Sequence, residues 1–579
     1  FDTPPRVQSA MITYSMRLLS IVACIFQAAA YPDQGNVYTT NAGVPIDDAV
    51  NSQTVGSRGP ILLQDAWLVE RLQVHNRERI PERNVHARGF TAKGNFTLMV
   101  DWSNTTMAEL FTGEPGKKTP IACRWSTVIH SLGSPEFLRD PRGFAVKHYT
   151  QEGNYDIVGL NFPIFFIRDG IRFPEMIRSL KPNPKTGVQE WWRIWDYFSN
   201  FPESLHMFSW LLDDVGIPAG WELEDGWGIH TYKWVNATGS VKLVRYYWKS
   251  RQGVESLQDE EATQKHFRYV GHDGPRADRG LSWRVWLGCR SFASTQMHDK
   301  IESGIFPTWD VYVQILDPSE QLNFSFDVLD TTKQWPEAEI PLHYVGYYEF
   351  DTNVDSWFLE NEMVAFSPGR LVPGIEPSDE KMLQTRIFAY SDTQRYRLGV
   401  NYQMLPVNKP QCPFQDNHID GYMNFGGPDS KSSKEINYFP STIDPTVHVA
   451  EPYPHETEEY LEAFKVRQMI NKTDDFEQPR ARYQSFDEDR QNRFAMRLAS
   501  TYSGDRMDQT VFQTWMRYWQ TVDIGLYQKI IEYMDSMQFA STNMKDISAM
   551  NEAEATKLMK GREMLRLSNA FFKASGSSA

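Results

Sequence analysis

The chain has 579 residues, which is enough for more than one structural unit and a large buried core. Its net charge of -15 and its pI of 5.4 argue against nucleic acid or an anionic membrane as the main partner. The four cysteines are widely spaced and form no CxxC pair, so they make neither a zinc site nor a disulfide framework. Aromatic residues make up 13% of the chain, which suits either a thick core or a large flat apolar cofactor.

Residues 1–30 are predicted to be a leader. Met16 and Arg17 precede an apolar run that is too short to span a bilayer, and small residues follow before Tyr31. This pattern is typical of a secretory signal peptide and predicts an exported protein; a buried first helix is the alternative. Five glycosylation sequons support export mildly and begin at Asn95, Asn104, Asn236, Asn323 and Asn471. The chain ends in Ser-Ser-Ala rather than in a peroxisomal signal of the Ser-Lys-Leu type.

The next segments differ clearly in composition. Residues 31–75 are polar, with Gly and Pro, and predict an extended arm. Residues 86–347 contain β-branched and aromatic runs punctuated by Gly and Pro, such as FAVKHYT and WDVYVQIL. Several such strands in a large chain indicate a barrel or a sandwich. Residues 271–300 interrupt this pattern, either as a surface loop or as sequence foreign to the mature protein.

The C-terminal half separates into an irregular part and a helical part. Residues 348–468 are rich in Pro and Gly, with one helix among long irregular pieces. Residues 469–579 carry apolar side chains at helical spacings, which predicts a helical bundle rather than a cofactor site. The apolar positions are Phe494, Met496, Leu498, Phe512, Trp515, Tyr518, Trp519, Ile530, Ile531 and Met534.

The helix within the irregular part carries the residues on which the functional prediction depends. Ser378 is placed to cap its start, and Asp379 and Glu380 would put negative charge in its first turn. Arg386 and Tyr390 are four residues apart, so their side chains lie on one helix face. A guanidinium in that place favours the ionised phenol, and a phenolate is a strong axial ligand for haem iron. An ordinary surface pair is the alternative for these two residues taken alone.

Two strings in the chain resemble the signatures of the haem catalases. RIFAYSDTQ at 386–394 resembles the proximal signature, and RERIPERNVHARG at 77–89 resembles the distal one. Other stretches, among them DPRGFAVKHYT and HMFSWLLDDVGIP, resemble the plant-type, small-subunit branch. The resemblance implies an α+β haem-catalase fold. Its parts would be an arm with the distal histidine segment at 31–85, an eight-stranded antiparallel β-barrel at 86–347, a wrapping segment with the tyrosine helix at 348–468, and a helical domain at 469–579.

The resemblance also implies haem b as the cofactor, with Tyr390 as the axial ligand of its iron. The family's subunits form a homotetramer in which the arm threads between neighbours, so a homotetramer is expected. Plant-type relatives are mostly peroxisomal. A peroxisomal location is therefore the alternative to export.

On the distal side, His86 matches the residue that moves a proton between the two peroxide oxygens, a task that suits a group titrating near neutrality. Ser126 would orient the imidazole, and Val85 would narrow access to the haem face. Asp140 matches a channel carboxylate, although within DPRG it is equally a turn former. The aromatic wall of the pocket would consist of Phe165, Phe166 and Phe173.

On the cofactor side, the resemblance assigns three arginines to the haem propionates, because buried carboxylates need bidentate partners. They are Arg83, Arg124 and Arg397. His230 would lie behind Arg386 and extend the hydrogen-bond chain to the phenolate. Gln394 closes the proximal signature, as is usual in the plant-type branch.

The distal half departs from the family at one position. The family's peroxide-orienting asparagine follows a glycine, but here Leu160 follows Gly159. Asn161 comes next, and on a strand its side chain faces the opposite side, so it is only a tentative substitute that would need a bulge. We therefore expect a working pocket that lacks one hydrogen-bond donor.

The positions that bind NADPH in animal relatives are mostly unmatched. His206 and Lys249 remain, but Asp213, Val215 and Glu337 replace the polar or basic partners. Carboxylates would repel a phosphate-bearing ligand, so we expect no tightly bound dinucleotide.

The leading functional prediction is a catalase that converts hydrogen peroxide to water and oxygen on haem b and so protects against oxidative stress. A haem peroxidase or lipid-hydroperoxide enzyme is the alternative, favoured by the more apolar pocket that Leu160 makes. A haem-binding or structural relative without activity is a third reading. The intact Arg386, Tyr390 and His86 argue against it.

Overall fold

The computed structural model describes residues 37–267, 291–412, 416, 418–424, 435–443, 449–456, 465–470, 474–503 and 506–542. The leader predicted at 1–30 lies outside these residues, as do the sequon at Asn471 and most of the 271–300 segment. The chain divides into two compact units, Phe1–Pro81 and Glu82–Ala579, and each is described by itself. Among the helices of the described residues, none has the length and apolarity that crossing a bilayer requires.

In the described part of the first unit, residues 37–81, an irregular chain carries one helix, α2 (Ala66–His75). The Asp65 carboxylate caps this helix by accepting a hydrogen bond from Leu68 N at 3.0 Å. Large apolar side chains are exposed here: Val50 is 90% exposed and Leu63 is 87% exposed. The described part of this unit therefore covers little of its own apolar surface.

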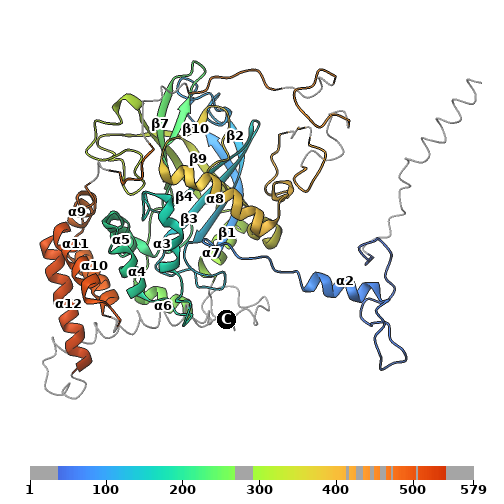
Figure 1. The fold of residues 1–579 in the computed structure, drawn as a ribbon, viewed down its shortest axis with the longest axis horizontal. Helices are drawn as coiled ribbons and strands as arrows, with labels where there is room; N and C mark the ends of the chain where they lie inside the picture. The colour runs from blue at the N-terminus through green and yellow to red at the C-terminus, as the bar shows by residue number, and fades with distance from the viewer. Residues whose placement is uncertain are drawn as a thin grey trace, which may run out of the picture. The chain divides into compact units, whose positions relative to one another are not determined.

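The second unit is built on an antiparallel sheet whose two ends meet (Figure 1). Strand β7 pairs with β5 on one side and with β8 on the other, which closes an eight-stranded ring in the order β1, β2, β3, β4, β5, β7, β8, β9. The ring strands are β1 (Gly89–Leu98), β2 (Lys118–Thr127), β3 (Arg142–Thr150), β4 (Gly153–Leu160), β5 (Gly226–Trp227), β7 (Val241–Ser250), β8 (Thr308–Leu316) and β9 (Leu342–Asn353). Strands β6 (Tyr232–Val235) and β10 (Ile375–Pro377) extend it beyond β7. The predicted eight-stranded antiparallel barrel is confirmed, and the domain boundary predicted at 347 falls inside β9.

Alternation along the strands fills the barrel with aromatic side chains. On β2, Cys123 and Trp125 belong to the apolar core, whereas Arg124 and Ser126 on the opposite face bond to His86. The fully buried tryptophans of the core are Trp125, Trp221, Trp234, Trp248 and Trp309. Much of the aromatic content therefore serves the core of the barrel.

Helices interrupt the region that the sequence predicts as largely strands. Between β4 and β5 lie α3 (Phe173–Leu180), α4 (Trp191–Phe198) and α5 (Leu205–Leu211), and between β7 and β8 lie α6 (Asp259–Phe267) and α7 (Phe292–Glu302). The sequence of α4, WWRIWDYF, has weak intrinsic helix preference, so its packing against other helices decides its conformation.

The C-terminal helices form the predicted bundle beside α4 and α5 (Figure 1). They are α9 (Glu477–Gln484), α10 (Glu488–Tyr502), α11 (Gln509–Val522) and α12 (Ile524–Thr542). Trp515 packs edge-on against Trp195 at 4.5 Å between ring centroids, and its indole N–H donates to the Trp195 carbonyl at 2.8 Å. The helical stripes seen in the sequence are thus core, as predicted.

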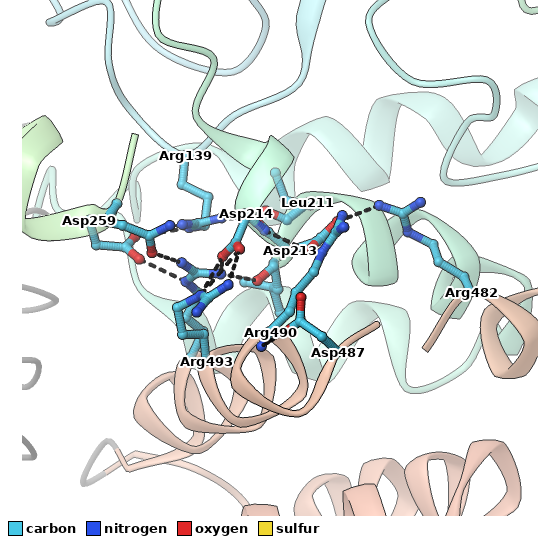
Figure 2. Close-up of polar contacts among 12 residues, drawn as sticks. Arg139, Leu211, Asp213, Asp214, Asp259, Arg482, Asp487, Arg490 and Arg493 are labelled. Atoms are coloured by element: carbon cyan, nitrogen blue, oxygen red, sulfur yellow. Dashed lines mark hydrogen bonds and ion pairs between the residues drawn. The ribbon is translucent and has the colours of Figure 1, made fainter. Parts of the chain in front are cut away.

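A network of ion pairs joins this bundle to the barrel side of the unit (Figure 2). Asp213 is fully buried and accepts hydrogen bonds from Arg482 and Arg490. Asp214 accepts from Arg493 at 2.6 Å and also from Arg497. Burial acts to raise the pKa of Asp214, but these two arginines lower it to about 2. The bundle is therefore held by buried charge as well as by apolar contact.

Candidate active site

The proximal half of the site lies on α8 (Lys381–Leu398). Arg386 Nη2 donates a hydrogen bond to the Tyr390 hydroxyl, and the guanidinium carbon lies 4.5 Å from the centre of the Tyr390 ring. The two side chains share one helix face, as their spacing predicts. Tyr390 is half-buried against an apolar cluster that includes Val158 and Phe366. A donor of fixed charge therefore holds the phenol oxygen.

A chain of polar groups lies behind this pair. Arg386 Nη1 is 2.6 Å from His230 Nε2, and a guanidinium can only donate, so Nε2 accepts. His230 Nδ1 then carries the ring proton and donates to the Glu380 carboxylate, which also accepts from Thr231 N at 2.9 Å. Burial lowers the pKa of His230, in keeping with a neutral ring. The sequence predicted a hydrogen-bond chain from Tyr390 through Arg386 to His230. The structure extends this chain by one residue, to Glu380.

Two predictions about the start of this helix are wrong. Glu380 supplies no charge to the first turn, because its carboxylate turns to His230 and Thr231. Ser378 does not cap α8 in the expected way, because its hydroxyl donates to the Thr231 carbonyl and the helix begins at Lys381. Both side chains bond to the buried residues His230 and Thr231, which precede β6, rather than to the helix end, and local sequence does not reveal these contacts.

The distal half is organised around His86. Its backbone is held in the left-handed region, with φ 63°, by a hydrogen bond from its N–H to the Val128 carbonyl at 2.8 Å. Nδ1 lies 2.9 Å from Ser126 Oγ, so the predicted orienting contact is present. Burial, and then the charges of Arg124, Arg386 and Arg83, lower the pKa of His86 to about 3. The imidazole is therefore neutral at ordinary pH, rather than titrating near neutrality as the sequence suggested.

A glycine makes room for this imidazole. Gly143 on β3 is the register partner of Ser126 on β2. A Cβ at Gly143 would lie 2.4 Å from His86 Nδ1 and 2.5 Å from Ser126 Oγ, which is closer than atoms tolerate. Sequence reasoning missed this residue. The one signal in the GFAVK string is the glycine itself, because a glycine within a strand often marks a place where another group approaches closely. The string does not show that this group is His86.

The three predicted propionate arginines gather in one buried cluster. Arg83 Nη2 donates to the carbonyls of residues 361, 362 and 364 at 2.9 to 3.1 Å, and Arg397 donates to two of the same carbonyls. Arg124 donates to the carbonyls of residues 86 and 87. Residues 361 and 362 end a short π-helix, Trp357–Glu362, which turns these carbonyls toward the arginines.

Within the part of the chain that the structure describes, the residues that approach this cluster do not balance its charge. The carboxylate near it is that of Glu362, 3.7 Å from Arg83 Nη1. Burial lowers the pKa of Arg83 to about 10, and burial together with Arg83 lowers that of Arg397 to about 8. Arg83 Nη1 is buried and makes no hydrogen bond to a described residue. Such a cluster fits a ligand that carries carboxylates, as the haem propionates do.

The peroxide-orienting position is apolar, as the sequence indicates. Leu160 is buried in the apolar cluster that also contains Val128 and Phe162. The Asn161 side-chain oxygen accepts a hydrogen bond from Arg142 N at 2.8 Å, and the Asn161 N–H donates to the Arg142 carbonyl at 2.9 Å. The structure therefore commits the Asn161 amide oxygen to β3 and does not bring it to His86.

The remaining distal residues line one apolar wall. Phe165 stacks on Phe173 at 6.4 Å and meets Phe166 edge-on at 5.8 Å between ring centroids, and Val85 packs against the same cluster. Asp140 is buried and accepts from Val128 N and Ile129 N, the backbone that follows Ser126. Burial raises the pKa of Asp140 to about 7. Asp140 thus shapes the turn beside the pocket, and its second oxygen makes no hydrogen bond within the described residues.

Two of the positions compared with a dinucleotide site have partners of their own. Asp213 is bound by arginines of the C-terminal helices, and His206 Nδ1 lies 2.9 Å from the Thr332 carbonyl oxygen. Lys249 is exposed on β7. The absence of a bound dinucleotide stays a prediction.

Comparison with known proteins agrees with this geometry. The family model described as Catalase matches residues 39–274 and 287–445, so the unmatched gap falls within the 271–300 segment that the sequence singled out. Catalase isozyme C of Oryza sativa subsp. japonica is 49% identical over 497 residues, covering 86% of this chain and 95% of the relative. Catalase-1 of Arabidopsis thaliana is 48% identical over 493 residues, covering 85% and 95%.

Solved structures give the same answer. Catalase A from Saccharomyces cerevisiae is similar with a TM-score of 0.77 at 32% identity, covering 86% of this chain and 98% of the other. A bacterial catalase has a TM-score of 0.76 at 34% identity, covering 88% and 97%. The chain therefore belongs to the catalase family and is an enzyme that disproportionates hydrogen peroxide.

Proposed function

We propose that this catalase works on haem b, whose iron the Tyr390 oxygen would hold. The observation that carries the proposal is the chain from Glu380 through His230 and Arg386, which ends on the phenol oxygen. The Arg386 guanidinium donates to that oxygen and so holds it in place, and a tyrosine oxygen is one of the ligands that proteins offer to haem iron. The buried arginines Arg83, Arg124 and Arg397 support the same cofactor, because their uncompensated charge suits its two propionates.

When bound, haem supplies an iron centre that first reduces one peroxide molecule and then oxidises another. The chain's own residues manage the protons. Ser126 engages Nδ1 of His86, which leaves Nε2 to take a proton from one peroxide oxygen and return it to the other. Arg83 and Arg124, which together with burial lower the pKa of His86, would be the residues that hold the carboxylates of the cofactor, and their charge on His86 would then be partly offset. Loading of the cofactor therefore also prepares the base.

The test of this proposal is the substitution Tyr390→Phe, with Tyr396→Phe as a matched control. Tyr396 lies on the same helix but is 80% exposed. Wild-type protein and the control should show Soret absorption and release oxygen from peroxide, and Tyr390→Phe should change the spectrum and lose oxygen release. An unchanged spectrum in Tyr390→Phe contradicts the axial assignment.

We further propose that Leu160 weakens the distal pocket by removing one hydrogen-bond donor. Restoring an amide with Leu160→Asn should raise the rate of oxygen release. A hydrogen-bond donor aimed at developing charge typically lowers the activation free energy by roughly 3 kcal/mol. Equal rates would show that the amide is not missed. A peroxidase or lipid-hydroperoxide enzyme is the second candidate, favoured by the apolar surroundings of Leu160. Oxygen release without an added reductant separates the two.

Assembly and location are proposals of the same kind. A homotetramer is supported by family membership and by the exposed apolar side chains of the Phe1–Pro81 unit, such as Val50 and Leu63. Light scattering of the purified protein measures the mass directly. Export is supported by the leader at 16–30, with a peroxisomal location as the alternative. The N-terminal residue of protein isolated from its source decides whether the leader is removed.

A further inference from the structure

A tyrosine and a histidine meet inside the barrel, apart from the residues discussed so far. Tyr348 lies on β9 and His148 on β3, which are not neighbours in the ring, so the two side chains meet across the interior. The Tyr348 hydroxyl oxygen is 3.1 Å from His148 Nε2. Each residue is 1% exposed. A buried phenol is thus bonded to a buried imidazole, although neither has a part in the distal or proximal chain.

The direction of this hydrogen bond follows from the other ring nitrogen. His148 Nδ1 is 3.1 Å from the Tyr155 carbonyl oxygen, which can only accept. Nδ1 therefore carries the proton, and Nε2 is a bare acceptor for the Tyr348 hydroxyl. Burial lowers the pKa of His148 to about 4, so the ring is neutral, and burial raises the pKa of Tyr348 well above its usual range. At rest the pair is a neutral phenol donating to a neutral base.

Aromatic contacts connect this pair to the strand that forms the distal pocket. Trp125 lies on β2 between two of the pocket residues, with its ring inside the barrel. Its ring centre is 4.8 Å from that of Phe350, which is 6.3 Å from that of Tyr348. A second route passes through Phe144 and Trp248, with centroid separations of 5.2, 5.1 and 6.2 Å. The Tyr348 ring is therefore two ring contacts from Trp125 by the first route and three by the second.

We propose that Tyr348 is a redox-active tyrosine that gives one electron to the active site while its proton passes to His148 Nε2. A phenol that loses an electron becomes a strong acid, so the O–H bond breaks and an N–H bond forms on the imidazole to which it is already bonded. The oxidant is hydrogen peroxide, which takes two electrons and two protons to become two waters. Tyr348 replaces one of the two electrons drawn from the haem, and the protons for water come from solvent. The inference rests on the proposed haem cofactor.

The experiment is electron paramagnetic resonance of haem-loaded protein that is frozen soon after a small excess of peroxide is added. Wild type should show an organic radical signal with the hyperfine pattern of tyrosine, and ring-deuterated tyrosine should collapse that pattern. Tyr348→Phe should lose the signal. His148→Phe keeps the phenol but removes the base, and it should lose most of the signal too. The control is Tyr155→Phe, which removes a neighbouring phenol and leaves the bond between Tyr348 and His148 in place.

The outcomes separate this inference from the proposed function. Soret absorption and oxygen release are measured on the same samples, so failure of the haem assignment is seen there first. In that event, flash-generated ruthenium(III) tris-bipyridine oxidises the haem-free protein, and the tyrosyl signal should again depend on Tyr348 and His148. An active wild type without an organic radical, or a signal unchanged in Tyr348→Phe, overturns the inference.

Discussion

The substitution Gly143→Ala tests whether the distal imidazole depends on the space that Gly143 leaves. Gly143 has no positive φ, so alanine suits its backbone and the effect is purely steric. The new methyl group would lie 2.4 Å from His86 Nδ1 and 2.5 Å from Ser126 Oγ. Ordinary contact requires roughly 3.5 Å, so the imidazole and the hydroxyl must each move by about 1 Å.

Two magnitudes follow from that displacement. Overpacking of a filled site typically costs about 1 to 3 kcal/mol of unfolding free energy. A misplacement of about 1 Å at the reacting group costs roughly 100-fold in rate. The turnover of peroxide should therefore fall far more than the stability, as measured by an oxygen electrode and by urea unfolding. Gly525→Ala is the control, because its Cβ would meet only the end of the Asp523 side chain, at 3.1 Å.

The result that refutes this reasoning is a Gly143→Ala variant with wild-type kcat/KM and the wild-type urea midpoint. His86 would then have another position from which it works. A variant that loses about 100-fold in kcat/KM while its unfolding free energy drops by about 1 to 3 kcal/mol supports the steric reading most directly.

Three further predictions concern buried charge. Glu380→Gln removes the carboxylate that accepts from His230 and Thr231, so turnover should fall and unfolding free energy should drop by about 2 kcal/mol in urea; Asp379→Asn, whose side chain is 75% exposed, should do neither. Asp214→Asn leaves Arg493 without its carboxylate partner and removes one of the two carboxylates of Arg497, which keeps Asp259. This change should lower unfolding free energy by about 2 to 3 kcal/mol, with oxygen release unchanged at low temperature. Acid should destabilise the protein in two steps. Burial lowers the folded pKa of His130 and His206 to about 3 and that of His148 to about 4, so these rings stay neutral while the unfolded chain takes up protons. The free energy of unfolding therefore falls as pH drops below 6.5, by about 2 kcal/mol per histidine at pH 5. The lowered pKa of Asp214 adds stability that is present above 3.8 and is lost as pH falls toward 2. Urea unfolding from pH 8 to pH 3 measures both steps, and a flat profile between pH 7 and pH 5 contradicts the first.

Local spacing was enough to predict the proximal pair. Arg386 and Tyr390 meet because a helix places residues four apart on one face, and the helix itself has no competing signal. Alternation along a strand was enough to predict that Asn161 would not replace the missing amide at Leu160. The barrel and the helical bundle followed from strand-like runs, helical stripes and the resemblance to haem catalases.

Contacts between distant segments were beyond local reasoning. Glu380 reaches His230 across 150 positions in the chain, and nothing near Glu380 distinguishes it from a helix-capping acid. The role of Gly143 depends on the register between β2 and β3, which sequence patterns do not fix for buried strands. The lowered pKa of His86 depends on its burial and then on three arginines that approach it from separate segments.

The separation of the two halves along the chain has a consequence for biosynthesis. His86 and Arg124 emerge from the ribosome early, while Tyr390 and Arg397 follow some three hundred residues later. On the proposed haem assignment, a nascent chain that stops short of α8 would have the distal residues but neither Tyr390 nor Arg397. Capture of the cofactor would then follow the docking of α8, after the barrel strands have been made.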